Sequence, residues 1–215
     1  MVFSEDCRLC PRLAGFLDQV RAEHPGYHAL PVSSFGEPGS RLLIIGLAPG
    51  MHGANRTGRP FSGDYAGNLL YASLHKFGFA SCAGPLDAAG NANPLLHLCG
   101  CRITNAVRCL PPQNKPEPVE IRNCNGYVAA ELAILPHGSA VMALGTIAHQ
   151  AVLMALNLRK SSFAFGHGAQ HNLPNGLTLF DSYHCSRYNT QTKRLTAEMF
   201  ETVIGNIVKH VDSRG

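Results

Sequence analysis

Three segments of this 215-residue chain combine glycines or strand ends with polar side chains that could act on a ligand. The first is GLAPGMHGANRTGRPFSGD, residues 46–64. Gly46, Gly50 and Gly53 predict a tight turn whose backbone N–H groups can approach a ligand, because glycine has no side chain and accepts positive φ. The spacing matches neither GxGxxG nor GxxxxGK[ST], so no nucleotide-binding motif is indicated.

Asp64 closes this first segment as a lone carboxylate at the start of an expected helix. It could serve catalysis, but an acid in the first helical turn also complements the helix dipole, and its position alone favours that ordinary role. Arg56 and Arg59 could meet phosphate. Phe61 is more typical of a core side chain than of a stacking surface.

The other two segments follow expected strands. Asn105 lies in TNAVRC (104–109), and its amide presents a donor and an acceptor side by side, which suits the edge of a nucleobase. An asparagine there could equally tie down the turn after the strand. His184 opens HCSRYNTQTKRLT (184–196), where it could donate to an anion developing on a leaving group.

The segment after His184 is locally basic. Arg187, Lys193 and Arg194 fall within eight residues that contain no acid, which is the kind of footprint that phosphates select. By itself a solvated loop explains such a run more often. The whole chain has 18 Lys+Arg against 14 Asp+Glu, a net charge of +4, which permits a polyanionic partner without requiring one.

The chain contains eight cysteines, and a reducing compartment disfavours their pairing in structural disulfides. Cys7-x2-Cys10 precedes an expected helix, and Cys109-x14-Cys124 follows an expected strand. Four thiolates would suit either a [4Fe–4S] cluster or a zinc ion, and the spacing leaves the choice open. The rival candidates are Cys82, Cys99, Cys101 and Cys185.

The elements that must position these groups form an α/β pattern. Short apolar runs predict strands at 41–46, 101–105, 139–145 and 177–182. Apolar residues at helical spacing predict helices near 9–20, 117–135, 146–156 and 195–210, and one after residue 62 that carries Leu69, Leu70, Leu74 and Phe77. Residues 82–93 and 166–176 are expected to be surface loops.

Alternating strands and helices predict a central four-stranded, mostly parallel sheet with helices on both faces, in one domain spanning residues 1–215. Ligands of such sheets bind beyond the carboxyl ends of the strands, where all three polar segments begin. No run approaches the ~20 apolar residues of a membrane span, and the N-terminus lacks the pattern of a signal peptide. We therefore expect a cytoplasmic protein without a membrane partner.

Taken together, the segments resemble the type B, or fifth-family, uracil-DNA glycosylases of the uracil-DNA glycosylase superfamily. GLAPGMHGANRTGRPFSGD resembles that family's first motif, including the run HGxNRTGR, and TNAVRC and the His-x-Ser…Arg-Leu-Thr segment resemble its later motifs. The resemblance implies a uracil-DNA glycosylase-like fold and a monomeric DNA-repair enzyme. Such an enzyme flips and hydrolytically excises uracil, with hypoxanthine and xanthine as further candidates, from double-stranded DNA and leaves an abasic site.

The resemblance also implies residue roles. Asp64 would be the catalytic carboxylate, since Leu47 stands where several sister branches have an acid or amide, and Asn105 and His184 would assist it. The residues expected to bind the base are Gly46, Ala48, Gly50, Phe61, Asn105 and His184. Those expected to bind DNA are Arg56, Arg59, Ser186, Arg187, Tyr188, Gln191, Lys193 and Arg194. The family's four cluster cysteines map onto Cys7, Cys10, Cys109 and Cys124, which favours a structural [4Fe–4S] cluster over zinc.

Two positions depart from the family pattern. Cys185 stands where proline is common and Lys193 where glycine is common, so the residue that fills the gap left by a flipped base is open between Tyr188 and Gln191. Two other classes of function compete: a non-catalytic nucleic-acid-binding module stabilised by zinc, and a small-molecule hydrolase. The second is weakened because the chain contains no GxSxG.

Overall fold

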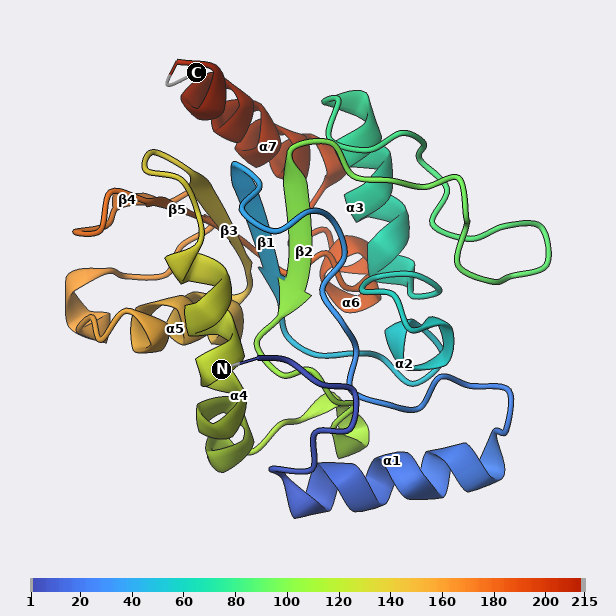
Figure 1. The fold of residues 1–215 in the computed structure, drawn as a ribbon. Helices are drawn as coiled ribbons and strands as arrows, with labels where there is room; N and C mark the ends of the chain where they lie inside the picture. The colour runs from blue at the N-terminus through green and yellow to red at the C-terminus, as the bar shows by residue number, and fades with distance from the viewer. Residues whose placement is uncertain (1, 214–215) are drawn as a thin grey trace.

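A computed structural model describes residues 2–213 and places five strands in one sheet, in the order β2-β1-β3-β5-β4 (Figure 1). The parallel strands are β1 (Leu42–Gly46), β2 (Cys101–Asn105), β3 (Ala140–Leu144) and β5 (Thr178–Ser182). They confirm the four strands predicted from the sequence. The fifth, β4 (Gln170–Asn172), pairs antiparallel with β5. The prediction of a surface loop over residues 166–176 is therefore wrong for these three residues.

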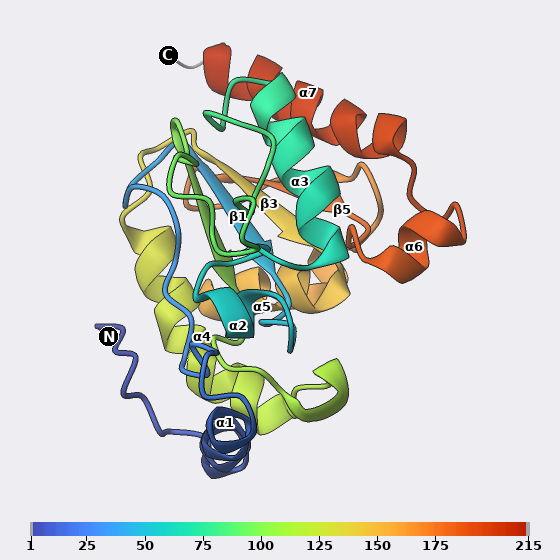
Figure 2. The ribbon, with the colours of Figure 1, turned by 90° about the vertical axis from the view of Figure 1, so that its right-hand side faces the viewer.

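The helices lie on both faces of the sheet, as predicted (Figure 2). Their bounds are α1 (Pro11–Glu23), α2 (Ala54–Thr57), α3 (Tyr65–Lys76), α4 (Pro118–Ala133), α5 (Thr146–Ala155), α6 (Arg187–Gln191) and α7 (Ala197–Asp212), with 3-10 turns at Pro112–Asn114 and Lys160–Ser162. The side chains of α3 and α7 share one core with the sheet, and those of α4 and α5 share another. Within residues 2–213, no helix is both long and apolar enough to cross a bilayer.

The strand β1 shows why its sequence is a continuous apolar run. Leu42 and Ile44 pack into the core beneath α3 and α7, whereas Leu43 and Ile45 pack beneath α4 and α5. All four are fully buried. Because successive side chains of a strand point to opposite faces, a strand covered on both faces needs apolar residues at every position, each worth roughly 1.5–3 kcal/mol of burial.

The helix α1 belongs to a third core, beyond the carboxyl end of β2. Its buried side chains Leu13, Leu17 and Val20 pack with Val107 and Leu110. The helix begins at Pro11, a residue suited to a first turn. Leu9, which the sequence pattern assigned to the helix, precedes it and is 53% exposed.

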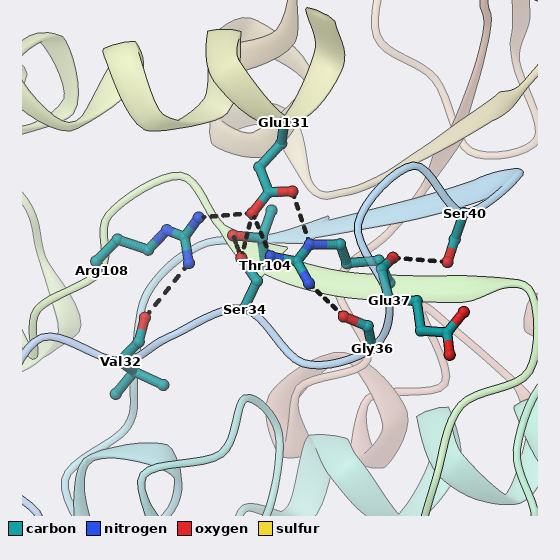
Figure 3. A network of polar contacts seen from close by, with 9 residues as sticks. Val32, Ser34, Gly36, Glu37, Ser40, Thr104, Arg108 and Glu131 are labelled. Carbon is teal, nitrogen blue, oxygen red and sulfur yellow. Dashed lines mark hydrogen bonds and ion pairs between the residues drawn. The ribbon is translucent and has the colours of Figure 1, made fainter. Parts of the chain in front are cut away.

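A buried ionic network connects α4 to β2 and to the loop before β1 (Figure 3). The Glu131 carboxylate accepts hydrogen bonds from Arg102 Nε at 2.7 Å, Arg108 at 3.3 Å and Ser34 Oγ at 2.5 Å. Arg108 is 2% exposed, so its charge depends on Glu131 for compensation. The network fixes the chain on both sides of Asn105, the last residue of β2.

Candidate active site

A cavity of about 510 Å³ opens at the carboxyl ends of β1, β2 and β5. This volume is within the usual range for small-molecule sites, about 300–1,000 Å³. The three polar segments predicted from the sequence meet here. The lining residues are Leu47, Ala48, Gly50, Ala54, Phe61, Asp64, Tyr65, Ala66, Asn105, Asn114, His184, Ser186 and Arg187.

Asp64 immediately precedes α3, but its side chain does not cap that helix. The carboxylate turns instead toward the glycine-rich turn, where the backbone N–H groups of Ala54 and Gly50 donate hydrogen bonds to it. Burial raises the pKa of Asp64 above its usual range, and these N–H groups and the charge of Arg56 partly oppose the rise. Asp64 therefore does not cap α3 by a side-chain hydrogen bond, and a partly buried carboxylate faces the cavity.

Two glycines make room for that carboxylate. A methyl group at Gly50 would lie 2.7 Å from both Asp64 carboxylate oxygens, and one at Gly53 would overlap the carboxyl group itself. The glycines of the first segment thus shape the site by leaving space for Asp64, in addition to freeing the backbone.

Phe61 forms one wall of the cavity in a strained conformation. Its φ of 59° lies in the left-handed region, which is uncommon for a residue with a side chain and concentrates at functional sites. A Cβ at Gly46 would be 2.6 Å from the Phe61 ring, and one at Gly67 would overlap the Phe61 carbonyl. Tyr71 Oη donates to the Pro60 carbonyl at 2.7 Å. These contacts hold the ring where it packs both in the core and against the cavity.

Asn105 lies at the end of β2, 3% exposed, and lines the cavity. Its Oδ1 has no hydrogen-bond partner among the described residues, so this oxygen does not tie down the turn. A buried amide oxygen without a partner costs about 1–3 kcal/mol, and a ligand in the cavity can supply the missing donor. Gly46 is again required, because a Cβ there would overlap this oxygen.

His184 follows β5 and stacks on Phe61, with ring centroids 6.0 Å apart and planes inclined at 28°. Burial lowers the pKa of His184 to about 4. The imidazole is therefore neutral near pH 7 and offers a neutral N–H donor to the cavity. Asn189 Nδ2 donates to the His184 carbonyl at 2.8 Å and fixes the backbone at this point.

The basic segment after His184 begins with a short helix, α6, where the sequence suggested a loop. Ser186 caps this helix by accepting from Asn189 N, and Ser186 and Arg187 line the cavity. The predicted DNA-binding side chains that are exposed are Arg187, Tyr188, Gln191, Lys193 and Arg194. Lys193 has a φ of 56°, in the left-handed region that glycine adopts more readily than a residue with a side chain.

Arg56 and Arg59 have intramolecular partners. Arg56 donates to the carbonyls of His52 at 2.9 Å and Gly90 at 2.7 Å. Arg59 donates to the Asn93 carbonyl at 2.6 Å. Both guanidinium groups thus brace the loop between α3 and β2, and their contact with DNA stays a prediction.

The four cysteines Cys7, Cys10, Cys109 and Cys124 converge on one small cavity beneath α1. Burial raises the pKa of Cys109, and the neighbouring thiols raise it further. Three groups donate toward the sulfurs: Arg108 N to Cys124 at 3.3 Å, Tyr127 Oη to Cys7 at 3.4 Å and Asn123 Nδ2 to Cys10 at 3.5 Å. Four clustered thiols surrounded by hydrogen-bond donors have the chemistry of a site for thiolate-bound metal.

The other four cysteines do not join this cavity. Cys101 lies inside β2 and Cys185 is fully buried after β5, whereas Cys82 is partly exposed and Cys99 is exposed. Of the eight cysteines, Cys7, Cys10, Cys109 and Cys124 share one cavity, and their role as metal ligands stays a prediction.

Comparison with known sequences identifies the family. The family model "Uracil DNA glycosylase superfamily" matches residues 33–207, which include all three polar segments. The chain belongs to the uracil-DNA glycosylase superfamily. This membership confirms the family and the fold class expected from the sequence.

Relatives in this superfamily extend over most of the chain. It is 48% identical to the type-5 uracil-DNA glycosylase of Thermus thermophilus, over 92% of this chain and 90% of the relative. It is 41% identical to the type-5 enzyme of Mycobacterium bovis (92% and 75%) and 36% identical to that of Pyrobaculum aerophilum (93% and 86%). The fifth-family resemblance is thereby confirmed.

Two contributors to this superfamily site escaped the sequence reasoning. Gly67 was not singled out in the sequence, but it leaves room for the Phe61 carbonyl. Tyr71 was not singled out either, but its hydroxyl donates to the Pro60 carbonyl. The only available signal was a glycine inside an otherwise strong helical pattern, which often marks a close packing contact.

Proposed function

We propose that this chain excises uracil from DNA by hydrolysing the bond between base and deoxyribose. This is the activity in the name of the type-5 uracil-DNA glycosylases to which it is similar. Membership of the superfamily makes the chain a DNA N-glycosylase that acts in DNA repair. The observation that carries the detailed proposal is the convergence of Asp64, Asn105 and His184 on one cavity beside the Phe61 ring. We expect a monomer that acts in the cytoplasm on double-stranded DNA.

The bond to be cut is shielded inside a stacked duplex, so the nucleotide must first turn out into the cavity. Phe61 then stacks on the base, and the Asn105 amide pairs with its polar edge. The unpartnered Oδ1 of Asn105 supports this role, because a base N–H can supply the donor that the protein does not.

As the bond breaks, positive charge develops on the sugar and negative charge on the base. The Asp64 carboxylate serves the sugar by stabilising this charge or by orienting the attacking water. The neutral His184 donates to a base oxygen, and N–H groups near Gly50 add to this stabilisation. Because burial holds the pKa of His184 at about 4, the group that donates near pH 7 is the neutral imidazole.

The exposed side chains after His184 would hold the DNA backbone. Arg187 and Ser186 line the mouth of the cavity, and Tyr188 beside them is 71% exposed. An exposed ring next to the base pocket supports Tyr188 as the residue that fills the gap left by the flipped nucleotide. Lys193 and Arg194 would contact phosphates farther along the strand.

The breadth of the cavity supports a wider choice of lesion. By the family resemblance, Leu47 stands where sister branches have an acid or amide, and the small side chains of Ala48 and Ala54 also line the cavity. We propose that deaminated purines such as hypoxanthine and xanthine enter the cavity as well as uracil.

The test is single-turnover base release from matched duplexes that carry uracil, hypoxanthine, xanthine or a thymine mispair, followed by alkaline cleavage of the abasic site. We expect release of uracil by the wild type and a loss of at least about 100-fold in Asp64→Asn, with DNA binding largely retained. Asp18→Asn is the matched control, because that acid is exposed on α1. Unchanged rates in Asp64→Asn would remove Asp64 from catalysis. DNA binding by the wild type without release of any base would favour a non-catalytic module.

We further propose that Cys7, Cys10, Cys109 and Cys124 hold a structural [4Fe–4S] cluster, with zinc as the alternative. Four thiolates around one zinc would lie about 3.8 Å apart, given a Zn–S bond of about 2.3 Å. The four sulfurs are spread more widely, since no three of them lie within 4.8 Å of one another. This spread supports a group larger than a single ion.

When bound, the cluster would cross-link the start of α1 to α4 and to the segment after β2, and the proposed reaction needs no redox step. We expect iron, sulfide and absorbance near ~400 nm in the purified protein, and their loss in Cys109→Ser. Stoichiometric zinc without iron would instead establish the alternative.

A further inference from the structure

A second cluster of side chains that could bind a metal shares no residue with the cysteine cavity. His149 of α5, His171 of β4 and Asp181 of β5 bring one ligand atom each within 4.8 Å of the others. These residues come from α5 and from the strands β4 and β5 at one edge of the sheet (Figure 1), and none of them lines the cavity that holds Asp64.

The separation of His171 and Asp181 suits a small divalent cation, whereas that of His149 and Asp181 is a hydrogen-bond length that metal binding would have to widen. His149 Nδ1 is 2.8 Å from Asp181 Oδ1, and His171 Nε2 is 3.4 Å from Asp181 Oδ2. Ligand atoms around a tetrahedral Zn²⁺ lie about 3.3 Å apart, because each metal–ligand bond is about 2.0–2.1 Å. Two imidazoles and one carboxylate are a common ligand set for zinc.

The hydrogen bonding of His149 sets its orientation as a ligand. Its Nε2 is 3.0 Å from the Phe163 carbonyl, which can only accept, so Nε2 carries the proton. Burial alone would lower the pKa of His149, but its hydrogen bond with Asp181 and the charge of that carboxylate raise it, so a proton on Nδ1 can bridge to Asp181 Oδ1. A metal ion would take the place of that proton on the Nδ1 lone pair. A carbonyl that holds the second ring nitrogen in this way is the usual partner of a metal-binding histidine.

Two further atoms of the cluster have no hydrogen-bond partner. Asp181 is fully buried and its Oδ2 is unpaired, and His171 Nε2 is buried without a partner. His171 Nε2 and Asp181 Oδ2 are 3.4 Å apart, close enough for an ion pair, but they do not form a hydrogen bond. A cation between these atoms would satisfy both of them and would replace the proton shared by His149 and Asp181.

Aromatic rings enclose the cluster. The Phe163 ring meets His171 edge to face at 5.7 Å between centroids, and Phe165 meets His149 in the same way at 5.6 Å. An apolar wall excludes competing water and strengthens the attraction between a cation and the carboxylate.

We propose that His149, His171 and Asp181 form a structural site for a divalent transition-metal ion of the zinc class, which fastens the edge strand β4 and the segment around Phe163 to α5. The site goes beyond the proposed glycosylase activity and is independent of it. Its ligands are nitrogen and oxygen atoms, which distinguishes it from the cysteine site.

The test uses the purified holo-protein, dialysed against a chelator and then titrated with Zn²⁺ in equilibrium dialysis. We expect one zinc per chain, with only nitrogen and oxygen neighbours at about 2.0–2.1 Å in X-ray absorption at the zinc edge, and none of the sulfur neighbours expected at about 2.3 Å. Loss of one ligand in His171→Gln should weaken binding by more than about 100-fold, since even loss of an outer partner costs about 10–100-fold.

His97→Gln is the matched control, because His97 is exposed on the connection between α3 and β2, toward the opposite edge of the sheet. It should bind zinc as the wild type does. His149→Gln provides a second ligand variant, and if it fails to fold, His171→Gln still decides. The proposal would be overturned if zinc bound only with sulfur neighbours, bound equally to His171→Gln, or did not bind. The last outcome would mean that protons alone satisfy the cluster.

Discussion

The space that the glycine turn leaves for Asp64 can be tested by adding single methyl groups. In Gly50→Ala the new Cβ would meet both carboxylate oxygens at 2.7 Å, whereas ordinary contacts begin near 3.4 Å. The carboxylate must therefore withdraw by at least about 0.7 Å. Because a misplacement of about 1 Å at a reacting centre can cost about 100-fold, we expect base release to slow by roughly 30- to 100-fold.

Gly53→Ala gives a graded second arm, because its methyl group would overlap the Asp64 carboxyl carbon rather than graze its oxygens. We expect a loss at or above about 100-fold. The displaced atoms are the end of one flexible side chain, so the fold should persist in both variants. Gly15→Ala is the control, because a methyl group there on α1 meets nothing within 4 Å.

The assay is single-turnover release of uracil from a duplex, with urea unfolding of each variant measured in parallel. The expected order of rates is wild type and Gly15→Ala together, then Gly50→Ala, then Gly53→Ala. Full activity in Gly53→Ala would refute the reasoning, since the carboxylate could then work from another position. A loss of activity matched by a loss of folded protein would refute it as well.

Three further predictions concern charge. The pKa of His184 is about 6.5 in the unfolded chain and about 4 in the folded one, so the unfolded state binds the proton first as pH falls. Between these pH values the wild type should lose roughly 3 kcal/mol of unfolding free energy, and His184→Gln should not. Urea unfolding at several pH values measures this difference. Glu131→Gln removes the charge that compensates buried Arg108 and should lower the free energy of unfolding by about 3 kcal/mol at pH 7, whereas a change below about 0.5 kcal/mol would show that the network contributes little. Arg187→Ala should reduce the slope of log affinity against log salt by about 1 in DNA-binding titrations, and an unaltered slope would place this side chain away from the phosphates.

Most of the fold could be predicted from local patterns. The runs LLII in β1 and AVMAL in β3 are apolar at every position, which only a strand covered on both faces requires. The edge strand β4 could not be predicted, because its residues QHN carry no apolar signal and only pairing with β5 makes them a strand.

The candidate site was predictable in membership but not in geometry. The sequence by itself determined that polar residues follow three buried strands, and parallel strands bring their carboxyl ends together. It also supplied the motif resemblance that singled out Asp64, whose position alone favoured a helix-dipole acid. Only the tertiary structure decided that this carboxylate turns to the backbone of Gly50 and Ala54.

The same division holds for the two candidate metal sites. Four of the eight cysteines converge because α1 docks beside α4, a contact between segments about a hundred residues apart. His149, His171 and Asp181 gave no spacing signal at all, because they come from a helix and two strands that meet only when the sheet edge forms. Residue types and local periodicity are properties of the sequence, whereas the distances between ligand atoms are set by long-range packing.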